Sequence, residues 1–191
     1  MHWYLILKRR MSRIRLVFKG VSEIVGTDDL GVLVLTDEKE QRQITVVCDK
    51  AMAVQAELRV HRVPITQIML PEVLCKVLAN QTELQLEILI SGIDDGQYRV
   101  MLYNKDTLEP TLIRAGDAVL LSMAGNIPIY IDHDLMMRQS VPYKEDSRGV
   151  SLPVNTISDE MLQAALDKAV EDENYELASH LRDEQLRRGK K

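Results

Sequence analysis

Large aromatic side chains are scarce in this sequence. Its 191 residues include one Phe, one Trp and six Tyr, so Leu, Ile, Val and Met must fill the interior. Proteins that hold single-stranded nucleic acid by stacking need several exposed rings along the binding groove. The composition therefore excludes an extended stacking platform, and any contact with nucleic acid must depend on other side chains.

An excess of positive charge is also missing. The chain has 24 basic and 29 acidic residues and a formal net charge of −5, which excludes a protein that coats nucleic acid electrostatically. The most basic stretch is Lys8–Lys19. Within it we predict that Arg13 and Arg15 bind nucleic acid through its phosphates; the alternative is that these charges keep a strand edge soluble.

Cysteines and long apolar runs are few. Cys48 and Cys75 lack the spacing of zinc ligands, and we expect both to be buried thiols in a reducing cytoplasm. No apolar run approaches the roughly 20 residues that span a bilayer. The apolar segment Trp3–Leu7 is followed by basic residues, whereas a secretory signal carries them before its apolar run. These features predict a cytoplasmic protein that does not contact a membrane.

Alternating apolar and polar residues predict strands along much of the chain. The expected strands cover residues 13–22, 31–36, 43–48, 84–90, 98–103 and 127–131, with a further short strand ending at Ile113. Between the fourth and fifth strands, Asp95-Gly96 is a strong turn signal. The expected order along the chain is three strands, two helices, three strands, a third helix and a last strand.

Three helices are expected beside these strands. The first covers 50–60, and the second begins near Pro71 and ends near Asn80. Their apolar stripes are expected at Ala51, Val54 and Leu58 in the first helix and at Leu70, Leu74, Val77 and Leu78 in the second. The third follows Asp117, whose carboxylate is expected to cap it, and closes at Gly125. This order predicts an α+β fold with a mostly antiparallel sheet, packed helices and two loosely similar halves.

Composition divides the chain into four segments. They are an N-terminal extension at 1–11, a main domain at 12–138, a polar linker at 139–157 and an antiparallel helical hairpin at 158–191. We expect the functional start at Met11, because the first ten residues have no pattern that joins them to the core. Two short helices bury little surface alone, so the hairpin must contact its own domain, a second copy or a partner. We also expect a homo-oligomer.

The hairpin carries a recognisable set of residues after an acidic turn. They are Tyr175-Glu176, Ala178 and Leu181-Arg182-Asp183-Glu184. This tail resembles the UVR motif, a helical hairpin of bacterial excision-repair and adaptor proteins. The resemblance implies contact with a protein partner through Tyr175, Ala178, Leu181 and Arg182. The alternative is an ordinary charged hairpin whose charges are solvated.

The main domain carries a second set of motifs. Residues 113–119 read Ile-Arg-Ala-Gly-Asp-Ala-Val, Ile127–Tyr130 follow them, and Pro64–Thr66 lie upstream. Together these segments resemble the bifunctional nuclease family, whose members are described as cleaving DNA and RNA. The resemblance implies a phosphodiester site with Arg114 and Asp117 as catalytic residues and single-stranded DNA or RNA as the ligand.

Several positions depart from that family pattern. Where the family has Glu-Ala, this chain has Lys50-Ala51, and where it has Thr-His-Asp-Leu, this chain has Thr66–Met69. Hydrolysis of a phosphodiester generally needs a metal held by carboxylates or an acid–base pair, and Lys, Gln and Ile cannot hold such an ion. The structural alternative for Asp117 is that it caps a helix while Arg114 pairs with it. The Asp132–Asp134 cluster is expected to be a surface turn.

Two functions follow as hypotheses. The first is a bifunctional nuclease that hydrolyses or binds nucleic acid, with Mg²⁺ or Mn²⁺ as its cofactor if it is active. The second is a non-catalytic adaptor that recruits a protein through the UVR-like hairpin. The substituted acidic and histidine positions favour the adaptor, whereas Arg114 and Asp117 favour the nuclease.

Overall fold

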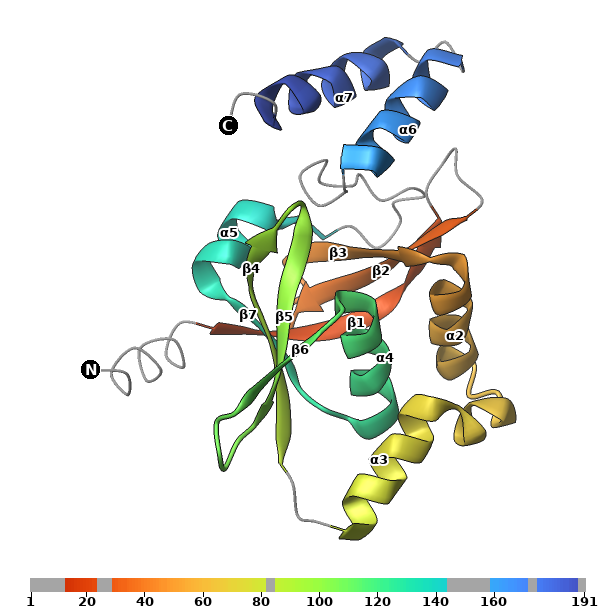
Figure 1. The fold of residues 1–191 in the computed structure, drawn as a ribbon, viewed down its shortest axis with the longest axis vertical. Coiled ribbons are helices and arrows are strands. Elements are labelled where there is room, and N and C mark those ends of the chain that lie inside the picture. Colours follow the sequence, from red (N-terminus) through yellow and green to blue (C-terminus); the bar gives the residue numbers. More distant parts are fainter. Residues whose placement is uncertain (1–12, 24–28, 82–84, 144–158, 172–174, 189–191) are drawn as a thin grey trace, which may run out of the picture.

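One mixed sheet is the frame of the molecule. The computed structural model describes residues 13–23, 29–81, 85–143, 159–171 and 175–188, and within them eight strands form a single sheet in the order β6-β5-β4-β7-β1-β2-β3-β8 (Figure 1). The strands are β1 Arg13–Glu23, β2 Leu30–Asp37, β3 Arg42–Asp49, β4 Leu86–Asp94, β5 Gln97–Asn104, β6 Pro110–Ile113, β7 Ile129–Asp132 and β8 Val141–Pro142. All neighbours are antiparallel except β4 and β7. The predicted α+β class with a mostly antiparallel sheet is confirmed.

Helices follow each group of strands. They are α2 Lys50–Val60, the 3₁₀ helix η1 Pro64–Ile68, α3 Leu70–Gln81, α4 Ala115–Gly125, α5 His133–Gln139, α6 Asp159–Glu171 and α7 Tyr175–Arg188. Helix α2 contacts β1, β2 and β3, and α4 contacts β3, β4 and β5. Helix α3 packs on α4 and η1. Both halves therefore have the same plan, in which three antiparallel strands lead directly to a helix that covers the sheet.

The turn between β4 and β5 forms as predicted. Asp95 has φ 47° and Gly96 has φ 76°, and the pairing of Asp94 with Gln97 closes a two-residue loop. Positive φ at both central positions matches the right-handed twist of the flanking strands, which is why Asp-Gly is favoured there.

The predicted buried face of α2 is wrong. Ala51 and Val54 are exposed, whereas Met52, Ala53 and Ala56 are buried. The physical reason is close packing on β2, because a Cβ atom at Gly31 would overlap the Cβ of Ala53. Small side chains are needed at this contact, so the larger side chain of Val54 points outward.

Two predicted features near the C-terminal part of the sheet are also corrected. Helix α4 begins at Ala115 after Arg114, which makes no side-chain capping hydrogen bond, so Asp117 lies in the first turn and does not cap it. Asp132 is not part of a surface turn. Its carboxylate accepts the amides of Asp134 and Leu135 and so caps α5.

The start of the predicted linker belongs to the sheet. β8 pairs with Arg42 and Gln43 of β3, and the Arg42 guanidinium donates from Nε to Ser140 Oγ at 2.6 Å and from Nη2 to the Ser140 carbonyl at 2.9 Å. The expected start at Met11 and the remainder of the linker from 144 lie outside the described residues. None of the helices in the described part is long and apolar enough to cross a membrane.

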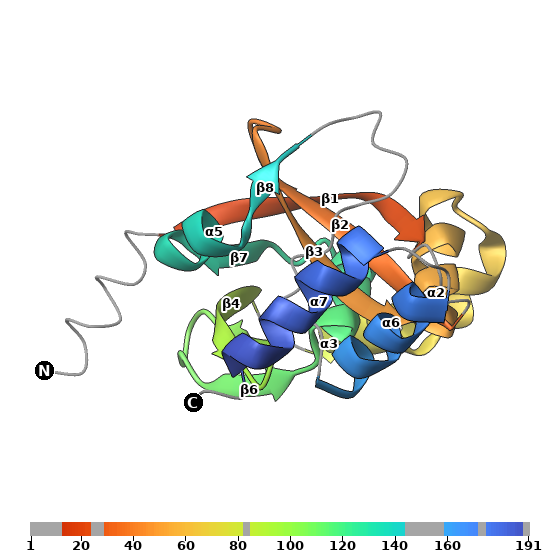
Figure 2. The same ribbon diagram turned by 90° about the horizontal axis from the view of Figure 1, so that it is seen from above.

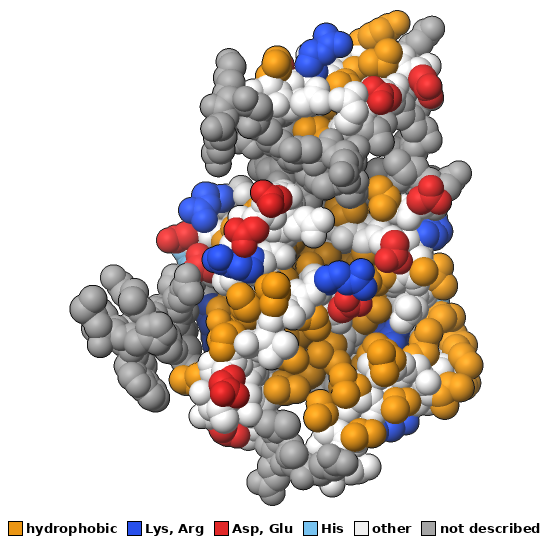
Figure 3. Space-filling view, in the orientation of Figure 1, with side chains coloured by type: hydrophobic (Ala, Val, Ile, Leu, Met, Phe, Trp, Pro, Cys, Tyr) orange, Lys and Arg blue, Asp and Glu red, His pale blue; other side chains and the backbone are white. Residues whose placement is uncertain are grey.

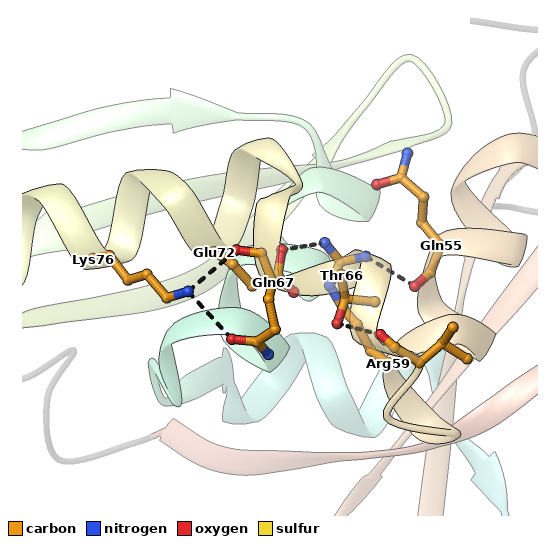
Figure 4. Close-up of polar contacts among 7 residues, drawn as sticks. Gln55, Arg59, Thr66, Gln67, Glu72 and Lys76 are labelled. Carbon is orange, nitrogen blue, oxygen red and sulfur yellow. Dashed lines mark hydrogen bonds and ion pairs between the residues drawn. The ribbon is translucent and has the colours of Figure 1, made fainter.

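A buried ion pair joins α2 to α3. Arg59 Nη2 lies 2.8 Å from Glu72 Oε2, and both side chains are less than a tenth exposed. Arg59 Nη1 also donates to the Gln55 carbonyl at 2.8 Å, and Thr66 of η1 donates to the Val63 carbonyl at 2.9 Å (Figure 4). These contacts fix the angle at which the chain turns from α2 through η1 into α3.

The two C-terminal helices lie side by side (Figure 2). Their apolar seam contains Leu162, Leu166 and Ala169 from α6 and Ala178 and Leu181 from α7, with Val47 of β3 packed against it. Tyr175 and Leu186, also on α7, are 70% and 59% exposed. Among the described side chains of α7, Ala178 and Leu181 form its part of the seam.

Candidate functional site

A pocket opens where the two similar halves of the sheet meet their helices. It has a volume of about 270 Å³ and is lined by residues of β3 and β5 and by the first residues of α2 and α4. The polar groups on its wall belong to Cys48, Asp49, Gln97, Tyr98 and Arg114. Both helices therefore present their N-terminal ends to one cavity, and such ends attract negative charge.

Arg114 stands at the start of α4 and is an exposed charge of this pocket. Its Nε donates to Asp117 Oδ2 at 2.7 Å, while the two side chains are 74% and 40% exposed. This hydrogen bond raises the pKa of Arg114, and the negative charges of Asp117 and Asp49 add to the effect. The predicted pairing of Arg114 with Asp117 is present. In the described part of the chain, Nη1 and Nη2 of Arg114 have no hydrogen-bond partner, so this edge of the guanidinium can receive an anion.

Asp49 has a structural task in the same pocket. Its Oδ1 accepts the amide of Met52 at 2.7 Å and caps α2. The cap satisfies one of the amides that the first turn of a helix leaves without a partner. No equivalent side-chain cap is present on α4, so the amides of its first turn remain the better donors for a ligand.

Tyr98 and Cys48 are neutral groups on the inner wall. Tyr98 is 8% exposed, and its hydroxyl has no hydrogen-bond partner among the described residues. Burial raises the pKa of Tyr98, so the phenol stays protonated and is a potential donor. Burial, with a contribution from the charge of Asp49, raises the pKa of Cys48 to about 11. The Cys48 thiol, which donates weakly to the Gly31 carbonyl at 3.5 Å, is therefore not a nucleophile near neutral pH.

Sequence analysis missed Asp49 and Tyr98 as members of this site. Asp49 could have been predicted from the sequence, because Asp49-Lys50 is a junction from strand to helix like Ile113-Arg114. Tyr98 carries no such signal, since it follows a hairpin turn and reads as an ordinary strand residue. Only the pairing of strands far apart in the sequence brings these side chains to Arg114.

The two arginines predicted to bind nucleic acid lie elsewhere, on β1. Arg13 Nη1 is 2.8 Å from Glu87 Oε1, and its guanidinium lies 3.9 Å from the centre of the Tyr130 ring. Arg15 is 53% exposed and lies 3.6 Å from Glu38. Arg13 is thus held inside the protein by an acid and an aromatic ring, whereas Arg15 remains accessible at the surface.

The positions that depart from the family pattern do not gather in one place. Lys50 begins α2 beside the pocket, whereas Gln67 and Ile68 lie in η1 beyond the other end of this helix. Eleven residues of helix separate these ends by about 16 Å. The three substitutions therefore affect different parts of the surface.

The carboxylates near the pocket do not fit a divalent metal well. Asp117 is engaged by Arg114 and Asp49 by the first turn of α2. Among the residues that the structure describes, no three His, Cys, Asp or Glu side chains come together as metal ligands. The His133 ring and Asp134 form an exposed contact of 3.2 Å, far from any third ligand of this kind within the same residues. The arrangement is suited to binding an anion rather than to holding a metal.

The four residues predicted to bind a protein partner divide into two groups. Ala178 and Leu181 are buried in the seam between α6 and α7, whereas Tyr175 is 70% exposed and Arg182 is also exposed. The exposed pair is available to another molecule, while the buried pair holds the two helices together.

The main part of the chain matches a known protein family. The family model of the bifunctional nuclease domain matches residues 33–144. This range begins in β2, ends just after β8, and contains the pocket residues Asp49, Tyr98 and Arg114. No curated protein matches the chain.

Proposed function

The chain belongs to the bifunctional nuclease domain family, and from this membership we propose that it binds the phosphates of single-stranded DNA or RNA at the pocket around Arg114. The observation that carries the proposal is the position of Arg114. Its guanidinium is 74% exposed at the uncapped start of α4, where the helix dipole and backbone amides also favour an anion.

The neighbouring groups support binding of one phosphate at a time. Arg114 remains hydrogen-bonded to Asp117 through Nε. Nη1 and Nη2 can therefore donate together to two phosphate oxygens. The negative charge of Asp49 would repel a second phosphate, because its carboxylate lies on the same wall of the pocket. Recognition of this kind is independent of base sequence.

We propose that hydrolysis is weak or absent compared with family members that keep the Glu, His and Asp positions. Asp117 would act as the catalytic carboxylate, but a metal bound by one carboxylate is held weakly unless substrate phosphates complete its shell. We expect no cleavage of single-stranded DNA or RNA above background with Mg²⁺ or Mn²⁺. Metal-dependent cleavage that disappears in Asp117→Ala would contradict this expectation.

Binding is tested by fluorescence anisotropy of a labelled oligothymidylate at several salt concentrations. Arg114→Ala should weaken binding for every base sequence and reduce the slope of log K against log salt by about 0.7, as expected for one lost contact to a single strand. Arg138→Ala is the matched control, because Arg138 is an exposed arginine in the last turn of α5. Equal binding by the Arg114→Ala variant and the wild-type chain would refute the proposal.

A second candidate function is favoured by the exposed side of the hairpin. Tyr175 and Arg182 are accessible on α7, and the resemblance of this tail to the UVR motif supports a contact with a protein partner. On this account the chain is an adaptor, and its pocket binds nucleic acid without cleaving it. The double variant Tyr175→Ala/Arg182→Ala should then lose a partner that Arg114→Ala retains.

A further inference from the structure

An acid and a base occupy matching positions in the two halves of the fold. Asp49 is the N-cap residue of α2, and Arg114 is the N-cap residue of α4. Both line the same pocket. The pKa of Arg114 is raised chiefly by its hydrogen bond with Asp117 and further by the negative charge of Asp49, so Asp49 and Arg114 lie within electrostatic reach of each other. The pocket therefore offers a cation and an anion to one ligand.

Asp49 keeps one carboxylate oxygen for a ligand. Its Oδ1 accepts the Met52 amide at 2.7 Å, and among the described residues Oδ2 has no hydrogen-bond partner. The residue is exposed and lines the pocket. An ionised carboxylate only accepts hydrogen bonds, so the group that Oδ2 binds must be a donor.

Along a nucleic-acid backbone, the 2′-hydroxyl of ribose is the group that donates a hydrogen bond. The phosphate oxygens only accept, and DNA lacks this hydroxyl. A DNA strand held by Arg114 would therefore bring only acceptors to Asp49, whose charge would repel them. An RNA strand brings one donor with each nucleotide, next to the phosphate that Arg114 binds.

The walls of the pocket fit a sugar and a phosphate better than a base. The pocket volume of about 270 Å³ is small beside the roughly 300–1,000 Å³ of most small-molecule sites. Proteins that hold an unstacked base usually place it against an aromatic ring or a guanidinium plane. The aromatic residue among the described lining residues, Tyr98, is 8% exposed, so its ring is not a platform for a base.

Basic side chains do not form a track along this face of the molecule. Figure 3 shows them standing singly among acidic and apolar side chains on the described part of the surface. A strand bound at this face would contact few phosphates. A hydrogen bond to its sugar would therefore supply a larger share of the affinity than in a protein with a continuous basic groove.

We propose that the pocket selects RNA over DNA, with Asp49 Oδ2 accepting the 2′-hydroxyl of the nucleotide whose phosphate Arg114 binds. The inference rests on the proposed function, because Arg114 must hold the phosphate for Asp49 to read the sugar. An acidic residue that accepts a ribose hydroxyl also marks the sites where dinucleotide-binding folds hold NAD. Asp49 is then a specificity-determining residue, whereas Arg114 supplies affinity for both nucleic acids.

Fluorescence anisotropy with labelled oligouridylate and oligodeoxyuridylate of equal length tests the inference, because the two probes differ only in the 2′-hydroxyl. We expect the wild-type chain to bind the RNA about tenfold more tightly, the lower range for a hydrogen bond to a charged group. In Asp49→Ser this preference should disappear, since the Ser hydroxyl still caps a helix but the second carboxylate oxygen is gone. Asp106→Ser is the matched control. It removes an exposed acid between β5 and β6 and should keep the preference.

Arg114→Ala separates this inference from the proposed function. The substitution should weaken binding of both probes, because each loses its phosphate contact. Binding that does not depend on Arg114 would overturn the proposed function and the inference with it. Arg114-dependent binding that is equal for the two probes, or a preference for RNA that survives Asp49→Ser, would overturn the inference alone.

A 2′-fluoro oligouridylate gives a readout that needs no protein variant. The fluorine keeps an RNA-like sugar conformation but cannot donate a hydrogen bond. The wild-type chain should bind this probe as weakly as it binds the oligodeoxyuridylate, and this comparison decides the matter even if Asp49→Ser fails to fold. Binding as tight as that of the oligouridylate would contradict a contact to the hydroxyl.

Discussion

The Arg114 side chain is anchored at one nitrogen and exposed at the others. Its Nε holds Asp117, which fixes the guanidinium at the start of α4, while the rest of the group stays in water. Arginine is suited to this arrangement because its planar fork can satisfy two oxyanions at once. Lysine offers a single ammonium group and could not keep Asp117 and hold two oxygens of a phosphate in fixed positions.

Arg59 shows the opposite use of the same side chain. Arg59 is buried together with Glu72. Removing one member of a buried ion pair destabilises the fold, because the other charge stays buried without a partner. Glu72→Ala should therefore destabilise the protein by about 3–5 kcal/mol in urea unfolding, because the charge of Arg59 is left buried without compensation. Glu57→Ala, at an exposed position of α2, should change the free energy of unfolding by less than about 0.5 kcal/mol. Similar stabilities of the two variants would show that solvent reaches Arg59.

At the scale of elements, glycines let α2 pack closely on β2 and let α4 pack closely on α2. A Cβ atom at Gly31 would overlap that of Ala53, and one at Gly116 would overlap Met52. This close approach is what brings the first turns of both helices to one pocket. A helix that stood further from β2 would widen the pocket and move Asp49 away from Arg114.

Gly31→Ala tests this close approach. The substitution should destabilise the protein by about 1–3 kcal/mol, the usual cost of overpacking a core, because the Cβ of Ala53 leaves no room for an added methyl group. Gly20→Ala in β1 is a control with the same change of residue, since a Cβ there would meet nothing within 4 Å. Chemical denaturation of both variants decides the matter, and an equally stable Gly31→Ala protein would mean that α2 can shift without cost.

Most of the elements that were predicted from the sequence are long enough to carry a detectable pattern, whereas two of those that were missed are not. Alternation predicted β1, in which exposed and more buried residues take turns. β2 and β3 are buried along most of their length, and they were predicted from apolar runs that end at turn signals. β8 and η1 are short, with two and five residues, and segments of this length carry no measurable period. The apolar stripe of α3 was predicted at helical spacing, but its exposure to solvent was not, because the spacing is the same whether the stripe faces the core or the solvent.

The candidate site was predictable only in part for a similar reason. Arg114 and Asp117 are three residues apart, so their pairing follows from helix geometry alone. Asp49 and Tyr98 reach the same pocket through strands that are distant in sequence, and no local pattern indicates it. The α2 face was misjudged because side-chain size, rather than apolarity, decides which residues fit against Gly31.

At the scale of the whole molecule, the net charge of −5 leaves little general attraction for nucleic acid. Arg13 is paired inside the protein and Arg15 lies beside Glu38, so a broad basic surface does not form along β1. Phosphate binding must then depend on local geometry at the pocket. Affinity should therefore be modest and sensitive to salt.

A titration of the ¹⁵N-labelled full chain with a short oligothymidylate, followed by two-dimensional NMR, tests the central claim most directly. Binding at the pocket predicts that the largest shift changes fall on the amides of Ala115 and Gly116 and on the Arg114 Nε–H group, and that they vanish in Arg114→Ala. The account would be contradicted by changes centred on Arg15 or on the C-terminal hairpin, or by a spectrum that does not change at all.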